Sequence, residues 1–175
     1  MQNLQSSIGQ RVVGAARLDV ATYEAVERDV NANTQALIVV VLAAIASGIG
    51  SLGVDGASSF VTGLIGALVG WIIYAGLAYL IGTRLLATAQ TRATYGEVLR
   101  TLGFAQAPRL LLVLAWIPLL GWLIAAAVGI WVLVATIIAI RQSMELTTGR
   151  AIGTAVIAWL IYIIVNALIL TALAF

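Results

Sequence analysis

Residues 122–140, WLIAAAVGIWVLVATIIAI, form a run of 19 uncharged residues that ends directly before Arg141. A helix of this length spans about 28 Å, close to the roughly 30 Å hydrocarbon core of a bilayer. A helix on the surface of a soluble protein would carry a polar face, and this run has none. The stretch therefore predicts a membrane-spanning helix.

The rest of the chain has the same character. Hydrophobic residues make up 62% of the 175 positions and charged residues only 9%, against about 25% charged residues in soluble domains. Three other apolar runs, 36–54, 60–81 and 152–175, are also long enough to cross a bilayer. This composition indicates an all-α, polytopic membrane bundle, because too few charges are present to cover a water-facing surface.

A further apolar run, at about 102–120, is interrupted by Pro108 and Arg109. The run that follows it, 122–140, is long enough to cross. If the run at 102–120 did not cross as well, the arginine-rich segments on the two sides of this pair of runs would lie on opposite faces of the membrane. We therefore expect five spans, with Pro108 in the first turns of the third. The predicted membrane domain is 35–175, with spans at about 36–54, 60–81, 102–120, 122–140 and 152–175.

The arginines give the predicted orientation. The chain has nine and no lysine, and all nine lie before the first span, between the second span and the apolar part of the third, or between the fourth and fifth. Positively charged loops stay in the cytoplasm. We therefore predict a multi-pass protein of the cell membrane, with its amino terminus in the cytoplasm and its carboxyl terminus outside.

Two cytoplasmic segments have helical patterns. In the amphipathic segment 1–34, apolar residues recur every three or four positions, with Asp19 as the expected N-cap of the second stretch and Glu24 spaced to pair with Arg28. These helices either dock on the bundle, lie in the headgroup layer or bind a partner. Thr94 and Glu97 have the spacing of a capping box, which predicts a short interfacial helix, although a loop remains the alternative.

Several kinds of chemistry are not expected. The chain has no cysteine and no histidine, which removes thiolate nucleophiles, imidazole bases and the common zinc ligands. No glycine turn gathers the acidic residues of segment 1–34 into a cation site, and no basic stripe with interleaved aromatics suits nucleic acid. We expect no enzyme, no metal site, no cofactor and no nucleic-acid partner.

A few residues in the predicted spans have specific expected roles. Arg109 is interpreted as an interfacial anchor, near the cytoplasmic end of its span, whose side chain reaches lipid phosphate. Small residues spaced four apart allow helix backbones to approach closely, within one bundle or between protomers, and Asn166 is expected to bond a neighbouring helix. The predicted helix-packing residues are Gly63, Gly66, Gly70, Gly121, Ala125, Gly129 and Asn166.

Short motifs along most of the chain resemble those of one known family. They include Ala16-Arg17-Leu18-Asp19, Tyr95-Gly96-Glu97-Val98, the segment Gly103 to Pro108, and Ile117-Pro118. From about Arg11 to Leu170 the chain resembles bacterial members of the Ypt-interacting protein (Yip) family. The resemblance implies a five-span domain with a cytoplasmic amino terminus. In eukaryotic relatives it also implies binding to Rab-type GTPases, a role that does not transfer residue by residue to this chain.

Two functions remain open from the sequence. The favoured one is a non-enzymatic scaffold or accessory subunit in the bacterial inner membrane, which binds membrane lipids, other membrane proteins or further copies of itself. The alternative is a small oligomeric channel or transporter. A dry bundle core would favour the scaffold, whereas a guanidinium of Arg109 that faces a cavity deep in the bundle would favour the alternative.

Overall fold

The computed structural model describes residues 7–55 and 58–173, and these residues form helices and turns without any strand. Four of the helices are long and apolar enough to cross a membrane: α3 (Ala32–Asp55), α4 (Ser58–Leu80), α6 (Gly121–Ser143) and α7 (Thr148–Leu173). They coincide, within a few residues, with four of the five predicted spans. The count of five and the orientation stay predictions.

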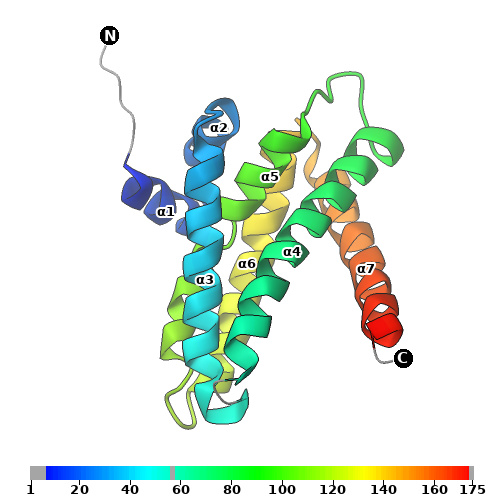
Figure 1. The fold of residues 1–175 in the computed structure, drawn as a ribbon. Coiled ribbons are helices and arrows are strands. Elements are labelled where there is room, and N and C mark those ends of the chain that lie inside the picture. Colours follow the sequence, from blue (N-terminus) through cyan, green and yellow to red (C-terminus); the bar gives the residue numbers. More distant parts are fainter. Residues whose placement is uncertain (1–6, 56–57, 174–175) are drawn as a thin grey trace.

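The remaining elements are short. They are α1 (Ile8–Ala16), α2 (Val20–Arg28), the π-helical turn η1 (Ile81–Leu85), α5 (Tyr95–Phe104) and the 3₁₀-helix η2 (Ala107–Leu114). Figure 1 shows α1, α2, α5 and the loop after η1 at one end of the bundle. We call this the polar end, because Arg17, Arg28, Arg92, Arg141 and Arg150 lie in or beside its segments, and we call the opposite end, with the turn at 115–120, the apolar end.

The segment predicted as the third span is broken into two helices. α5 ends at Phe104, and Pro108 lies in the first turn of η2, whose backbone bonds join residues three apart, as from Arg109 N to Gln106 O. Proline has no N–H and disfavours helical backbone in the residue before it, so one continuous α-helix cannot pass this point without a break. The predicted third span, at about 102–120, is therefore not one continuous helix in the structure, and its crossing of the membrane stays a prediction.

The two pieces nevertheless run along the whole of α3, in the same direction (Figure 1). Near the polar end, a Cβ on Gly103 would lie 2.8 Å from the Cβ of Ala36. Near the apolar end, a Cβ on Gly50 would overlap the carbonyl oxygen of Leu112. Glycine permits both close approaches, and α5 with η2 thus carries the chain from the polar end to the apolar end.

The five lengthwise elements form a ring. α3 packs against α4, α4 against α7, α7 against α6, α6 against η2, and η2 against α3. Helix α5 lies inside the polar end of this ring, where it packs against α2, α3, α4 and α6. Its residues Leu102 and Phe104 are fully buried there. The ring is therefore closed at its polar end.

Local sequence sets where the short helices begin. Asp19 accepts a hydrogen bond from the Thr22 backbone and caps α2, and Glu24 pairs with Arg28 at 3.3 Å. Thr94 and Glu97 form a reciprocal capping box at the start of α5. The two caps satisfy backbone donors that a helix start leaves free, whereas Glu24 and Arg28 form an ion pair between side chains. These three predictions from the sequence are confirmed.

Buried charges attach α1 and α2 to the bundle. The Arg11 guanidinium, 6% exposed, lies 2.7 Å from the Asp29 carboxylate and donates to the side chain of Gln35 on α3. The Trp131 indole of α6 donates to the backbone oxygen of Ala16 at 2.7 Å. The amino-terminal helices are therefore docked on the bundle in this structure.

The predicted orientation can be tested with single cysteines, because the chain has none of its own. Leu119 is 90% exposed in the turn at the apolar end, and Gln90 is exposed in the loop at the polar end. We expect an impermeant thiol reagent to label Leu119→Cys in intact cells, and to label Gln90→Cys only after the cells are permeabilised. The reverse pattern would overturn the orientation.

Candidate functional site

A cavity of about 540 Å³ lies inside the ring of helices. It is lined by residues 40–44 of α3, 66–74 of α4, 129–136 of α6 and 155–162 of α7, together with Leu102, Gln106 and Arg109. Each of these ranges falls near the middle of its long helix. The cavity is thus halfway between the two ends of the bundle, and its volume is typical of a small-molecule site.

Small side chains leave this space open. A Cβ added to Gly66 or Gly129, which both line the cavity, would meet no atom within 4 Å, and Ala44 and Ala67 contribute to the same wall. A leucine at such positions would project into the cavity. The four-residue spacing in α4 therefore shapes a cavity within this chain.

The structure does not bring all the predicted helix-packing residues against a neighbouring helix. Gly63, like Gly66 and Gly129, faces open space, and Ala125 is exposed. The Asn166 amide donates to the Tyr162 backbone oxygen in its own helix, at 3.0 Å. Packing of these residues between protomers stays a prediction.

Two glycines do lie close to other groups. A Cβ on Gly70 would overlap the Tyr162 hydroxyl of α7. A Cβ on Gly121 would overlap the carbonyl oxygen of Ala115 in the turn that precedes α6. Only the first of these is an approach between two long helices.

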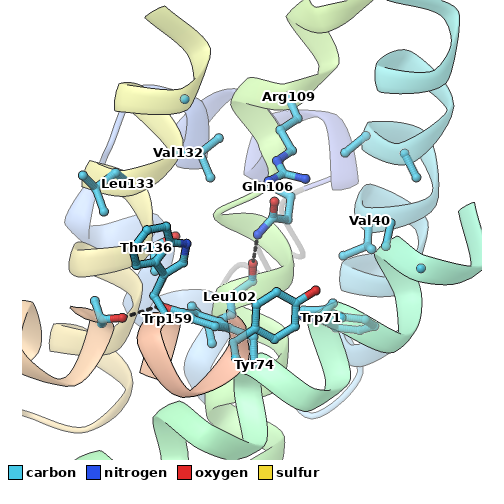
Figure 2. A pocket seen from close by; sticks show the side chains of 18 of the residues that line it. Val40, Trp71, Tyr74, Leu102, Gln106, Arg109, Val132, Leu133, Thr136 and Trp159 are labelled. Carbon is cyan, nitrogen blue, oxygen red and sulfur yellow. Dashed lines mark hydrogen bonds between the residues drawn. The ribbon is translucent and has the colours of Figure 1, made fainter. Parts of the chain in front are cut away.

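Among the described residues that line the cavity, Arg109 is the only charged one. Its side chain is accessible although the ring of helices surrounds it, because the accessible surface faces the cavity. Figure 2 shows the guanidinium extending from η2 toward the Gln106 amide. Within residues 7–55 and 58–173, the Arg109 guanidinium makes no hydrogen bond and no ion pair, although the backbone N–H of Arg109 donates to Gln106 O.

This position differs from the one that the sequence predicted for Arg109. We expected it near the cytoplasmic end of its span, but it lines a cavity at mid-height of the four long helices. The difference arises because the helical structure of this segment already begins at Tyr95. Arg109, in η2, therefore follows the whole of α5 instead of lying in the first turns of a span. Its role as a lipid anchor stays a prediction.

Neutral polar groups share the cavity with Arg109. Gln106 lies one turn before it, Thr136 is contributed by α6, and Tyr74 and Tyr162 come from α4 and α7. Tyr74 donates to the backbone oxygen of Ala155 at 3.2 Å, and its ring meets that of Tyr162 edge to face. These contacts fix the two tyrosines and join α4 to α7.

Two tryptophans complete the walls. The Trp71 indole donates to the backbone oxygen of Leu99 at 2.9 Å, which ties α4 to α5. Trp159 of α7 also lines the cavity and is 56% exposed. Both tryptophans lie at the cavity (Figure 2).

This arrangement can bind a ligand but offers no evident catalytic group. Its lining contains one cation, amide and hydroxyl groups, and apolar or aromatic walls, without a carboxylate. Among the described residues no group of three or more side chains could hold a metal ion. A guanidinium with five N–H donors is suited to carboxylate or phosphate.

The long apolar helices define the chain as a multi-pass membrane protein. The family model of the Yip1 domain matches residues 20–169, from α2 through most of α7, and the chain therefore belongs to the Yip1 domain family. No curated protein and no solved structure matches the chain. The match confirms the family that the motifs of the sequence resemble.

Proposed function

We propose that this Yip1-domain protein is a membrane carrier or receptor that binds an anionic ligand in its cavity through Arg109. One observation supports the proposal: an arginine whose guanidinium has no hydrogen-bonding or ionic partner among the described residues lines a cavity halfway through the bundle. An arginine at the bilayer centre costs at least about 2.5–3.5 kcal/mol. An anion bound in the cavity would offset part of this cost.

Of the two functions left open by the sequence, this proposal develops the transporter and sets aside the scaffold. A channel fits less well than a carrier, because α5 closes the polar end of the ring. Proton or cation coupling is not part of the proposal, since the lining has no carboxylate. We further propose a bacterial inner membrane as the location, with the polar end in the cytoplasm.

The test is the thermal stability of the purified protein in a neutral detergent, with added inorganic phosphate and, separately, added dodecyl phosphate. At least one of these anions should raise the melting temperature of the wild type. Arg109→Gln should weaken the binding of that anion by about tenfold or more, which corresponds to about 1.4 kcal/mol of binding free energy. Arg109→Lys keeps the charge and should retain most of the effect.

Arg92→Gln is the matched control, because it removes the same charge from an exposed loop at the polar end. Its response to both anions should equal that of the wild type. If Arg109→Gln responds like Arg92→Gln, or if neither anion stabilises the wild type, the proposed function is wrong.

A further inference from the structure

Two close approaches join α7 to α4 among the described residues. Tyr74 donates to Ala155 O in the half nearest the polar end, and Gly70 meets Tyr162 near the middle of both helices. Beyond Tyr162, Ile163, Ile164 and Leu168 are exposed, and Figure 1 shows α7 diverging from α4 toward its carboxyl end. In this half α7 lies apart from α4 (Figure 1), and exposed residues of α4, α6 and α7 that line the cavity mark an opening there.

The rim of the cavity lies at this opening. Gly66 on α4, Gly129 and Leu133 on α6, and Trp159 on α7 line the cavity and are exposed. The polar end is closed by buried residues of α5, such as Leu102 and Phe104. The accessible route to Arg109 thus runs sideways between apolar helices, at a depth where hydrocarbon surrounds the protein.

The ligand in the cavity must be able to pass between the apolar helices and must also carry a group that binds Arg109. A small inorganic anion would have to leave water and pass through hydrocarbon, which is costly for an unpaired charge. A second copy of this chain offers no suitable carboxylate, because none of its seven acidic residues lies in the middle of a long helix. An anionic lipid carries its charge on an apolar body and meets both conditions.

We propose that the cavity receives the anionic head of a membrane lipid, with its phosphate at Arg109 and its chains leaving through the opening beside α7. Gln106 and Thr136 add hydrogen-bonding groups around the head, and Trp159 and Leu133 contact the start of the chains. This inference rests on the proposed function, because it requires Arg109 to bind an anion. It adds the ligand class and the entry route.

The test reconstitutes the protein in phosphatidylcholine nanodiscs that contain a minor fraction of phosphatidylglycerol, and counts retained lipid by native mass spectrometry after release into mild detergent. The wild type should retain phosphatidylglycerol in preference to phosphatidylcholine. Arg109→Gln should lower this preference by about tenfold, a change of 1.4 kcal/mol. Arg92→Gln should leave it unchanged, which excludes general attraction to the arginines of the polar end.

Two further variants test the route. Gly66→Leu and Gly129→Leu place side chains into open space, and each should reduce retained phosphatidylglycerol without lowering the melting temperature. Either variant suffices if the other fails to fold. Equal retention in the wild type and in both leucine variants would overturn the lateral route.

The two proposals fail in different ways. If inorganic phosphate stabilises the wild type through Arg109 while phosphatidylglycerol is not retained, the lipid inference is wrong and the anion site stands. If neither the stabilisation by the phosphates nor the retention of phosphatidylglycerol depends on Arg109, both proposals are wrong.

Discussion

Replacement of Arg100 by alanine is expected to lower the free energy of unfolding by about 3 kcal/mol. The side chain is 3% exposed, and its Nε donates to the backbone oxygens of Val26 and Glu27 at the end of α2, at 2.9 and 2.8 Å. Buried carbonyls left without a partner cost about 1–3 kcal/mol each. The same change also leaves Glu27 facing Glu97 without the intervening cation.

The measurement is the melting temperature in detergent, with Arg92→Ala as the control for loss of an exposed arginine. The melting temperature of Arg100→Lys should lie between those of the wild type and Arg100→Ala, because an ammonium group cannot reproduce the planar arrangement of the guanidinium donors. Burial and the nearby Glu97 raise the pKa of the Glu27 carboxyl, so loss of Arg100 should raise it further. A melting temperature equal to that of Arg92→Ala would contradict the capping role of Arg100.

The second large effect is expected at Asp29. Asp29→Asn removes the charge that pairs with the buried Arg11 at 2.7 Å, and charged hydrogen bonds of this kind contribute about 1.5–3 kcal/mol. Because the Asp29 side chain is 26% exposed, we expect the lower part of that range. The amino-terminal helices should then detach from the bundle more easily, which limited proteolysis after Arg17 would detect.

This effect should depend on pH. The hydrogen bond from Arg11 lowers the pKa of Asp29 below its ordinary value, so the stabilisation is fully present above about pH 4 and disappears as the pH falls through the lowered pKa. The melting temperatures of the wild type and Asp29→Asn should therefore differ at pH 7 and converge in strong acid. A difference that persists unchanged at pH 2 would show that the charge is not responsible.

The long helices and the short caps could be predicted from the sequence because both depend on local features. An uncharged run such as 122–140 has one stable form in a bilayer, and Thr94 with Glu97 satisfies its own helix start. The break in the helix at Gln106 could be predicted less well from the sequence. Pro108 marks the place, but whether an α-helix continues after a kink or changes to a 3₁₀-helix depends on the packing of η2 between α3 and α6.

From the sequence, single polar residues of the cavity could be recognised, but the cavity itself could not. In the sequence, four polar residues stand within apolar runs, and nothing local indicates that they converge on one cavity: Gln106, Tyr74, Thr136 and Tyr162. The glycines show why. Gly66 and Gly70 have the spacing of a helix contact, and only the tertiary structure reveals that one faces empty space while the other faces Tyr162.

The break between α5 and η2 has a consequence for how the chain enters the membrane. In a protein with five crossings, as the sequence predicts, this third segment is too interrupted to partition from the translocon alone, because turns at residues 105–106 and 115–120 flank the short η2. It becomes stable in lipid only when α3 shields one side and α6 the other. We therefore expect α5, η2 and α6 to insert together as one hairpin, after α3 and α4 are already in the membrane. The third crossing would then be completed only when the fourth has been synthesised.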